Sequence, residues 1–292
     1  MVRCKSSPNW RRLRKDQVFY YRSKGHDGRR VLSIAFRFIT HDDEHQFALF
    51  YPYGPSSILN YLNRLNVEAE RSKLMISGTE FIQTGGRSLD LYKLFRIEQL
   101  GSSILFRPIH LMRISPVERS ESSNTTTVFI IGRLHGNLDS VSSYVCQGLI
   151  DFALSDEPVA RAARELMHLV VVPMLDPDSV IAGNSRTDIF GQAEMSRKLV
   201  QSNSNIYSNI CRLLDLVEES AKRQRTIFIE LQTNIKLIGL RTVSILYNDQ
   251  VRMEKHLQLP RLFARFINSF YLEKCVFFDR GNRLSIPIED LR

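Results

Sequence analysis

The sequence lacks the features that would place it at a membrane or outside the cell. It has no run of about 18 apolar residues, and no apolar segment follows its basic N-terminus, MVRCKSSPNWRRLRK. These absences argue against a transmembrane span and a secretory signal, so we expect a cytoplasmic location and no membrane partner. The four cysteines are far apart and form no Cys-x-x-Cys pair. Their spacing argues against a disulfide scaffold and against a thiolate zinc site.

The signatures of several other functional classes are missing as well. The chain contains no Gly-x-Ser-x-Gly nucleophile elbow, and no Gly-Lys-Ser/Thr phosphate loop occurs near Gly183 to Gly191. A basic cluster at residues 11–15 lies beside the aromatic VFYYR segment. No helix-turn-helix, zinc-finger or RNA-recognition signature accompanies this cluster, so we expect no nucleic-acid partner.

What the chain does have is an ordinary globular composition with an excess of positive charge. Its 292 residues are 43% hydrophobic, enough for one large core with a small appended unit. The formal net charge of +9 favours acidic partners, including acidic polypeptide tails.

The hydrophobic pattern changes from strand-like to mixed near residue 54. Strands are expected at Val18 to Arg22, Arg30 to Phe38 and Glu44 to Tyr51, between turn-forming segments. We therefore divide the chain into a partial N-terminal β-sandwich region, residues 1–53, and an α/β domain, residues 54–292.

The second region follows the order strand, helix, helix, strand. A buried strand is predicted at Thr127 to Ile131, followed by helices at Ser142 to Leu154 and Pro158 to Leu166 and a strand at His168 to Met174. This order predicts a mixed, mostly parallel sheet with helices on both faces. Further strands are expected at 89–97, 226–231, 236–247 and 275–278, and further helices from residue 56 and at 205–220 and 250–271.

Three segments together resemble a known family. They are Val128 to Arg197, Tyr51-Pro52-Tyr53, and IFIELQTN at residues 227–234. The chain resembles the cytosolic carboxypeptidases, which are zinc metallocarboxypeptidases, and most closely the members that trim glutamates from tubulin. Trp10 and Tyr20-Tyr21-Arg22 are similar to the end of the β-sandwich that precedes the catalytic domain. The resemblance implies the metallocarboxypeptidase fold, a zinc cofactor and acidic tails such as tubulin C-termini as partners.

The zinc ligands implied by this resemblance are only partly present. His135 occupies the first position of the family's His-x-x-Glu motif, and Leu138 stands where its glutamate is counted. If the loop has gained one residue, Asp139 is the substitute ligand; otherwise Asp139 is a helix N-cap. Gln232 stands at the position of the third ligand, a histidine. An amide oxygen is a poor zinc donor compared with imidazole, so we expect zinc to be absent or weakly bound.

The implied substrate-binding residues are better preserved. By resemblance, Arg186 stabilises the oxyanion, and Arg197, with Ser196 beside it, binds the terminal carboxylate. Without the family pattern, both arginines would be interpreted as surface residues of a long loop. No glutamate matches the general base, and we expect the domain to be truncated at its C-terminus.

These residues favour a cytosolic non-catalytic pseudo-peptidase that binds acidic C-terminal tails. The alternative is an active zinc carboxypeptidase from a truncated gene model, which removes C-terminal or side-chain glutamates from tubulin with Asp139 as second ligand. A third interpretation is a degraded paralogue that serves only as an interaction scaffold.

Overall fold

The fold was analysed in a computed structural model of the full chain. The structure describes residues 1–38, 41–77, 91–115, 125–134, 136, 140–185, 187–192 and 208–231, and the strands at 242–246, 274–279 and 282–287. The chain divides into two compact units, Met1–Thr233 and Asn234–Arg292. No helix of the described residues is long and apolar enough to cross a membrane.

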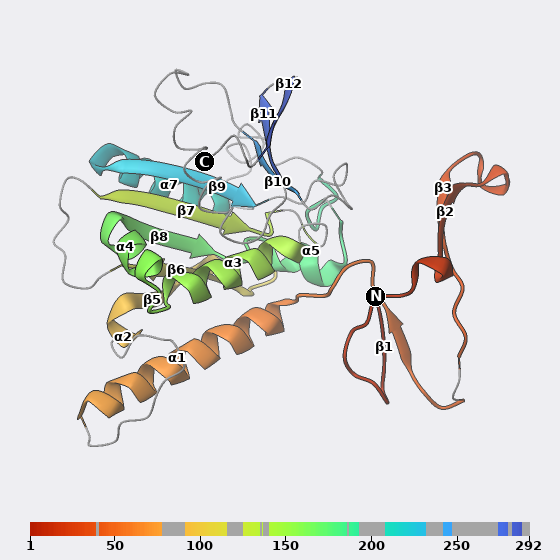
Figure 1. The fold of residues 1–292 in the computed structure, drawn as a ribbon, viewed down its shortest axis with the longest axis horizontal. Helices are drawn as coiled ribbons and strands as arrows, with labels where there is room; N and C mark the ends of the chain where they lie inside the picture. The colour runs from red at the N-terminus through yellow and green to blue at the C-terminus, as the bar shows by residue number, and fades with distance from the viewer. Residues whose placement is uncertain are drawn as a thin grey trace. The chain divides into compact units, whose positions relative to one another are not determined.

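The first unit is built around a five-stranded mixed sheet (Figure 1). Its strands, in spatial order, are β5 (Phe95–Ser102), β6 (Pro108–Ile114), β8 (Met167–Val172), β7 (Thr126–Gly132) and β9 (Arg225–Leu231). The central strand β7 pairs in parallel with both β8 and β9. The pairs β5–β6 and β6–β8 are antiparallel. Together with the helices described below, this sheet confirms the predicted α/β fold.

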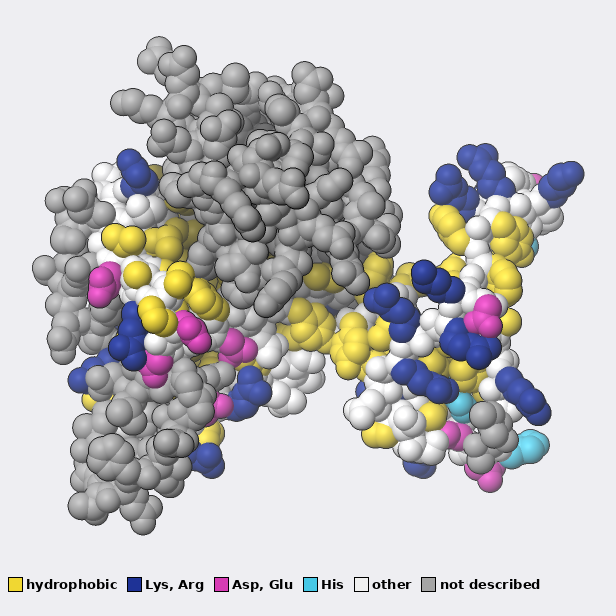
Figure 2. Space-filling view, viewed as in Figure 1, with side chains coloured by type: hydrophobic (Ala, Val, Ile, Leu, Met, Phe, Trp, Pro, Cys, Tyr) yellow, Lys and Arg dark blue, Asp and Glu magenta, His cyan; other side chains and the backbone are white. Residues whose placement is uncertain are grey.

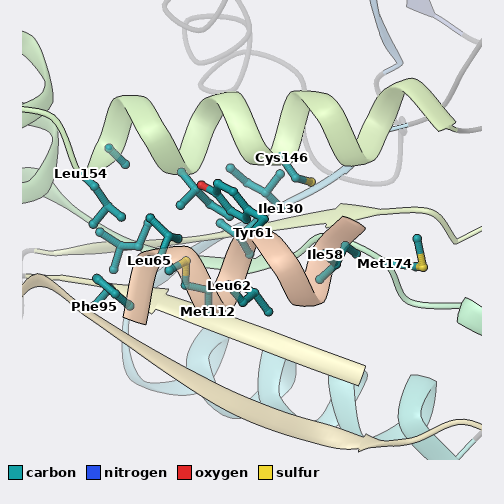
Figure 3. Packing of buried hydrophobic residues seen from close by; sticks show 14 of the residues in the cluster. Ile58, Tyr61, Leu62, Leu65, Phe95, Met112, Ile130, Cys146, Leu154 and Met174 are labelled. Carbon is teal, nitrogen blue, oxygen red and sulfur yellow. The ribbon is translucent and has the colours of Figure 1, made fainter. Parts of the chain in front are cut away.

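Successive side chains of β7 point to opposite faces of the sheet, so both faces are apolar and both are covered by helices. Val128 and Ile130 belong to a cluster that includes residues of α1 (Pro55–Ser77) and α3 (Ser140–Ala153). Figure 3 shows the side chains of this cluster, with Tyr61, Leu65 and Cys146 among them. Phe129 and Ile131 belong to a second cluster with Leu213 of α7 (Ser208–Arg223). The remaining helices are α2 (Leu91–Leu94), α4 (Pro158–Leu166) and α5 (Pro177–Ala182).

The N-terminal residues form two small antiparallel strand pairs. One joins β1 (Val2–Cys4) to β4 (His45–Phe47), and the other joins β2 (Val18–Arg22) to β3 (Arg30–Ile34). Short 3-10 turns, Lys15–Gln17 and Lys24–His26, lie beside β2. Figure 2 shows lysine and arginine side chains gathered over these strands. The domain boundary between residues 53 and 54 stays a prediction.

Most of the predicted elements are present, with local corrections. The strand expected at 89–97 begins only at Phe95, because Leu91–Leu94 forms a helical turn whose Leu91 joins the buried cluster of α1. Strands β1 and β6 and helix α5 were not predicted. The second unit contains β10 (Thr242–Leu246), β11 (Lys274–Asp279) and β12 (Asn282–Pro287) in one sheet, with β10–β11 parallel and β11–β12 antiparallel. The helix expected at 250–271 lies outside the described residues.

Candidate functional site

The carboxyl ends of three parallel strands define the edge of the sheet where a site is expected. Strands β8, β7 and β9 run in the same direction, and Gly132 at the end of β7 lies opposite Leu231 at the end of β9. Loops that follow parallel strands project into a crevice at this edge, which is where ligands bind in open α/β sheets. The strands that precede His135 and Gln232 in the sequence therefore end side by side.

All the residues that the sequence predicts for the site lie outside the described residues. These are His135, Asp139, Arg186, Ser196, Arg197 and Gln232. The structure describes the residues next to several of them: Leu134, Gly136, Ser140, Ser185, Thr187 and Leu231. The site can therefore be built from the residues that frame these positions.

Arg133 braces the loop that contains His135. Its side chain is 0% exposed, and its backbone adopts a positive φ of 53° directly after β7. Nη1 donates a hydrogen bond to the carbonyl oxygen of Gly136 at 3.0 Å, and Nη2 donates to that of Tyr53 at 2.5 Å. The fork of the guanidinium thus joins two segments that are 80 residues apart in sequence. No motif of the sequence indicates a role for this arginine, although it stands two residues before His135.

Two glycines allow the loops at this edge to approach one another closely. A Cβ atom at Gly132 would lie 2.8 Å from the carbonyl oxygen of Pro173 and 3.0 Å from Sγ of Cys146. A Cβ atom at Gly136, where φ is 27°, would lie 2.3 Å from the carbonyl oxygen of Asn184. Only glycine fits at these contacts, because the opposing atoms are mostly backbone atoms that cannot rotate away.

The loops after β7 and β8 are joined by backbone hydrogen bonds. Leu175 N donates to the carbonyl oxygen of Gly132, and Asp176 N donates to that of Arg133, both at 3.1 Å. The Asp176 carboxylate caps α5, accepting hydrogen bonds from Ser179 N at 3.1 Å and from Ser179 Oγ. Burial raises the pKa of Asp176 above its ordinary value. This carboxylate is therefore committed to local structure.

A second acidic residue, Asp178 in α5, is also structural. Its side chain is 2% exposed and forms an ion pair with Arg107, whose Nη1 lies 2.6 Å from Oδ1. Ser103 Oγ donates to Oδ1 at 2.7 Å, and Leu105 N donates to Oδ2 at 2.9 Å. Asp178 thus fastens the loop between β5 and β6 to α5.

The described residues on both sides of position 186 form turns. Gly183 ends α5 with a φ of 79°, and Asn184 N donates to the carbonyl oxygen of Ser179 at 3.0 Å. Asn184 Nδ2 donates to the carbonyl oxygen of Asp188 at 2.8 Å. Oδ1 of Asp188 accepts hydrogen bonds from the backbone N–H groups of Phe190 and Gln192, each at 2.9 Å. Asp188, which sequence reasoning did not single out, holds this loop together.

The Tyr51-Pro52-Tyr53 segment is fixed against α3. Tyr53 donates a hydrogen bond from its hydroxyl to Oε1 of Gln147 at 3.2 Å, and Tyr144 donates to the carbonyl oxygen of Pro52 at 2.9 Å. The rings of Tyr53 and Tyr144 meet edge to face with centroids 4.6 Å apart. Burial raises the pKa of Tyr53 to about 12, so its hydroxyl stays protonated and donates.

Comparisons with known proteins agree with this architecture. Residues 90–217 match the zinc carboxypeptidase family. The chain is 30% identical over 274 residues to cytosolic carboxypeptidase 6 of Mus musculus, covering 92% of this chain and 46% of the mouse protein. The Homo sapiens protein of the same name is also 30% identical over 274 residues, with 92% of this chain and 50% of that protein covered. The chain thus spans about half the length of these curated relatives.

Solved structures show the same fold at lower sequence identity. A putative carboxypeptidase A from Shewanella denitrificans superimposes with a TM-score of 0.64 at 16% identity, covering 92% of this chain and 61% of that one. A metallo-carboxypeptidase from Burkholderia cenocepacia superimposes with a TM-score of 0.61 at 16% identity, covering 90% and 61%. The motifs, the fold and these similarities agree: the chain belongs to the cytosolic carboxypeptidase family.

Proposed function

We propose that this chain is a non-catalytic member of its family, a cytoplasmic pseudo-peptidase that binds acidic C-terminal tails such as those of tubulin. The observation that carries the proposal is the donor set at the three zinc-ligand positions. Only His135 supplies an imidazole, while Leu138 or Asp139 and Gln232 occupy the other two positions. This set does not fit a zinc site of native affinity, because zinc requires three good N, O or S donors in fixed geometry.

The frame around these positions supports a retained binding role. Arg133 braces the loop, and Gly136 packs against Asn184. Backbone hydrogen bonds join the loops after β7 and β8. A packed sheet edge without a full set of zinc donors is suited to binding a ligand without cleaving it.

Tail binding rests on two arginines and on the charge of the chain. Arg186 and Arg197 keep the positions that bind the oxyanion and the terminal carboxylate in the family. A guanidinium donates two parallel hydrogen bonds to a carboxylate and stays charged at every physiological pH. The net charge of +9 attracts acidic peptides from a distance. The relatives' name, cytosolic carboxypeptidase, supports a cytoplasmic location.

Binding is tested with polyglutamylated and unmodified tubulin-tail peptides. The double variant Arg186→Ala/Arg197→Ala is expected to bind the polyglutamylated peptide at least about tenfold more weakly, since each lost ion pair costs about 1 kcal/mol or more. Arg161→Ala/Arg223→Ala is the matched control, because it removes the same charge from exposed positions on α4 and α7. Equal loss of affinity in both double variants would refute a specific tail site and leave only non-specific attraction.

The alternative function is zinc-dependent removal of glutamates from tubulin. It is favoured by the retained His135 and by the intact frame around its loop. In that case glutamate release would be sensitive to a chelator and abolished by His135→Ala. The non-catalytic proposal predicts no release, and it predicts that His135→Ala leaves the metal content of the purified chain unchanged.

A further inference from the structure

A group of potential metal-ligating side chains lies outside the carboxypeptidase motifs of the sequence. Strands β1 and β4 pair so that Cys4 is directly opposite His45. Asp43 precedes His45 by two residues, and its carboxylate joins the other two side chains. One potential ligand atom from each of the three residues lies within 4.8 Å of the others. Among the residues that the structure describes, this is the only such group of His, Cys, Asp or Glu.

The imidazole of this cluster is held in one orientation. Nδ1 of His45 lies 3.1 Å from the carbonyl oxygen of Asp43, a hydrogen bond that fixes the plane of the ring. The rings of Phe36 and Phe38 meet it edge to face, with centroid distances of 5.2 and 5.1 Å. Metal-binding histidines are commonly oriented by a hydrogen bond from their second ring nitrogen to a carbonyl oxygen.

The carboxylate and the thiol are positioned by one serine. Ser6 N donates to Oδ1 of Asp43 at 3.3 Å, and Ser6 Oγ donates to Oδ2. Sγ of Cys4 lies 3.3 Å from Ser6 Oγ. Each of the three potential ligands is partly buried, so the cluster is preorganised and yet open to an ion from solvent.

We propose that Cys4, Asp43 and His45 form a binding site for a divalent ion of the zinc type. Thiolate, imidazole and carboxylate together are donors that Zn²⁺ accepts, and a water molecule takes the fourth tetrahedral position. Zinc–ligand distances of about 2.0–2.3 Å place ligand atoms about 3.3–3.8 Å apart. The ligand atoms lie within 4.8 Å of one another, so each pair must approach by at most about 1.5 Å when the ion binds. When the ion binds, the Cys4 thiol releases its proton to solvent.

The bound ion stabilises the pairing of β1 with β4. A two-stranded sheet is marginally stable on its own in water, and the β1–β4 pair has only three paired positions. A metal that binds both strands adds its binding free energy to the stability of the pair. The cysteine spacing argues against a thiolate zinc site, and this proposal departs from that expectation. Its basis is the strand pairing that brings residue 4 beside residue 45, which the sequence alone does not reveal.

The site is tested by titrating the purified full chain with Co²⁺, a spectroscopic substitute for zinc. A Cys4 thiolate bound to Co²⁺ gives a charge-transfer absorption that oxygen and nitrogen ligands alone do not give. We expect this band to reach saturation at about one equivalent of Co²⁺, consistent with a single site. It is expected to persist in Cys211→Ser, the matched control for a partly exposed cysteine on α7. It is also expected to persist in His135→Ala, which separates this site from the family's zinc position.

Three variants decide the outcome. Cys4→Ser is expected to abolish the charge-transfer band, and His45→Ala and Asp43→Asn to weaken competitive Zn²⁺ binding at least about tenfold. Circular dichroism of each variant checks that the fold is retained, and the near-isosteric Asp43→Asn provides the readout if Cys4→Ser does not fold. Absence of a thiolate band in the wild-type chain, or its persistence in Cys4→Ser, would overturn the proposal.

Discussion

The two hydrogen bonds donated by Arg133 are expected to stabilise the fold measurably. Methionine has an unbranched side chain of similar length, and like arginine it must accept the backbone φ of 53° at this position. Arg133→Met therefore removes the hydrogen bonds to Gly136 and Tyr53 with little other change. Hydrogen bonds to a charged group contribute about 1.5–3 kcal/mol each. The methionine variant no longer buries a charge, and the desolvation cost that it avoids offsets part of the loss. We expect the free energy of unfolding to fall by about 3 kcal/mol, a large share of the typical 5–15 kcal/mol.

The assay is urea unfolding, with the midpoint and slope fitted for each variant. Arg161→Met is the matched control, because Arg161 is exposed and its ion pair with Asp156, at 3.3 Å, contributes at most about 1 kcal/mol. Arg133→Lys is expected to lie near the methionine variant, since an ammonium cannot reproduce the guanidinium fork. If Arg133→Met and Arg161→Met differ by less than about 1 kcal/mol, Arg133 is not the brace of this loop.

Three further predictions use other features of the first unit. Gly136→Ala is expected to lower the free energy of unfolding by about 2 kcal/mol or more, because its Cβ would meet the Asn184 carbonyl. The control Gly148→Ala, which lies in open space on α3, is expected to raise it by about 0.5–1 kcal/mol. Thermal melts in which both variants shift equally would contradict this. Burial raises the pKa of Cys146 to about 12, so mass spectrometry after alkylation at neutral pH should find Cys146 unlabelled in the folded chain; rapid labelling would disprove the buried assignment. Burial raises the pKa of Asp176, so ionising this carboxyl group in the folded chain costs stability as pH rises above about 3.9. The stability of Asp176→Asn relative to the wild-type chain should therefore increase with pH over that range. A stability difference that does not change with pH would refute the raised pKa.

The fold could largely be predicted because its central elements carry strong patterns. The β-branched apolar run that becomes β7 is buried on both faces, and the helical spacing of α1, α3 and α4 continues for several turns. Strand β6 was missed because consecutive residues Leu111 and Met112 are both buried, in different clusters, which obscures the period-two pattern. The helical turn at Leu91–Leu94 depends on tertiary packing that no local pattern reveals.

The candidate site was only partly predictable. Motif spacing identifies His135 and the two arginines, since family patterns are written in local sequence. The roles of Arg133 and Asp178 were not predictable, because Tyr53 and Arg107, the partners that reveal them, lie 80 and 71 residues away in sequence. The Cys4–His45 pair was hidden for the same reason, since it exists only through the pairing of β1 with β4.

On the proposed function, the changed donors at the zinc-ligand positions leave this chain without peptidase activity. The decisive measurement is glutamate release from polyglutamylated tubulin by the purified chain in the presence of added zinc. We expect release no greater than that of His135→Ala, together with retained binding of the tail peptide. Release that exceeds that of His135→Ala, and that a chelator abolishes, would refute the proposal.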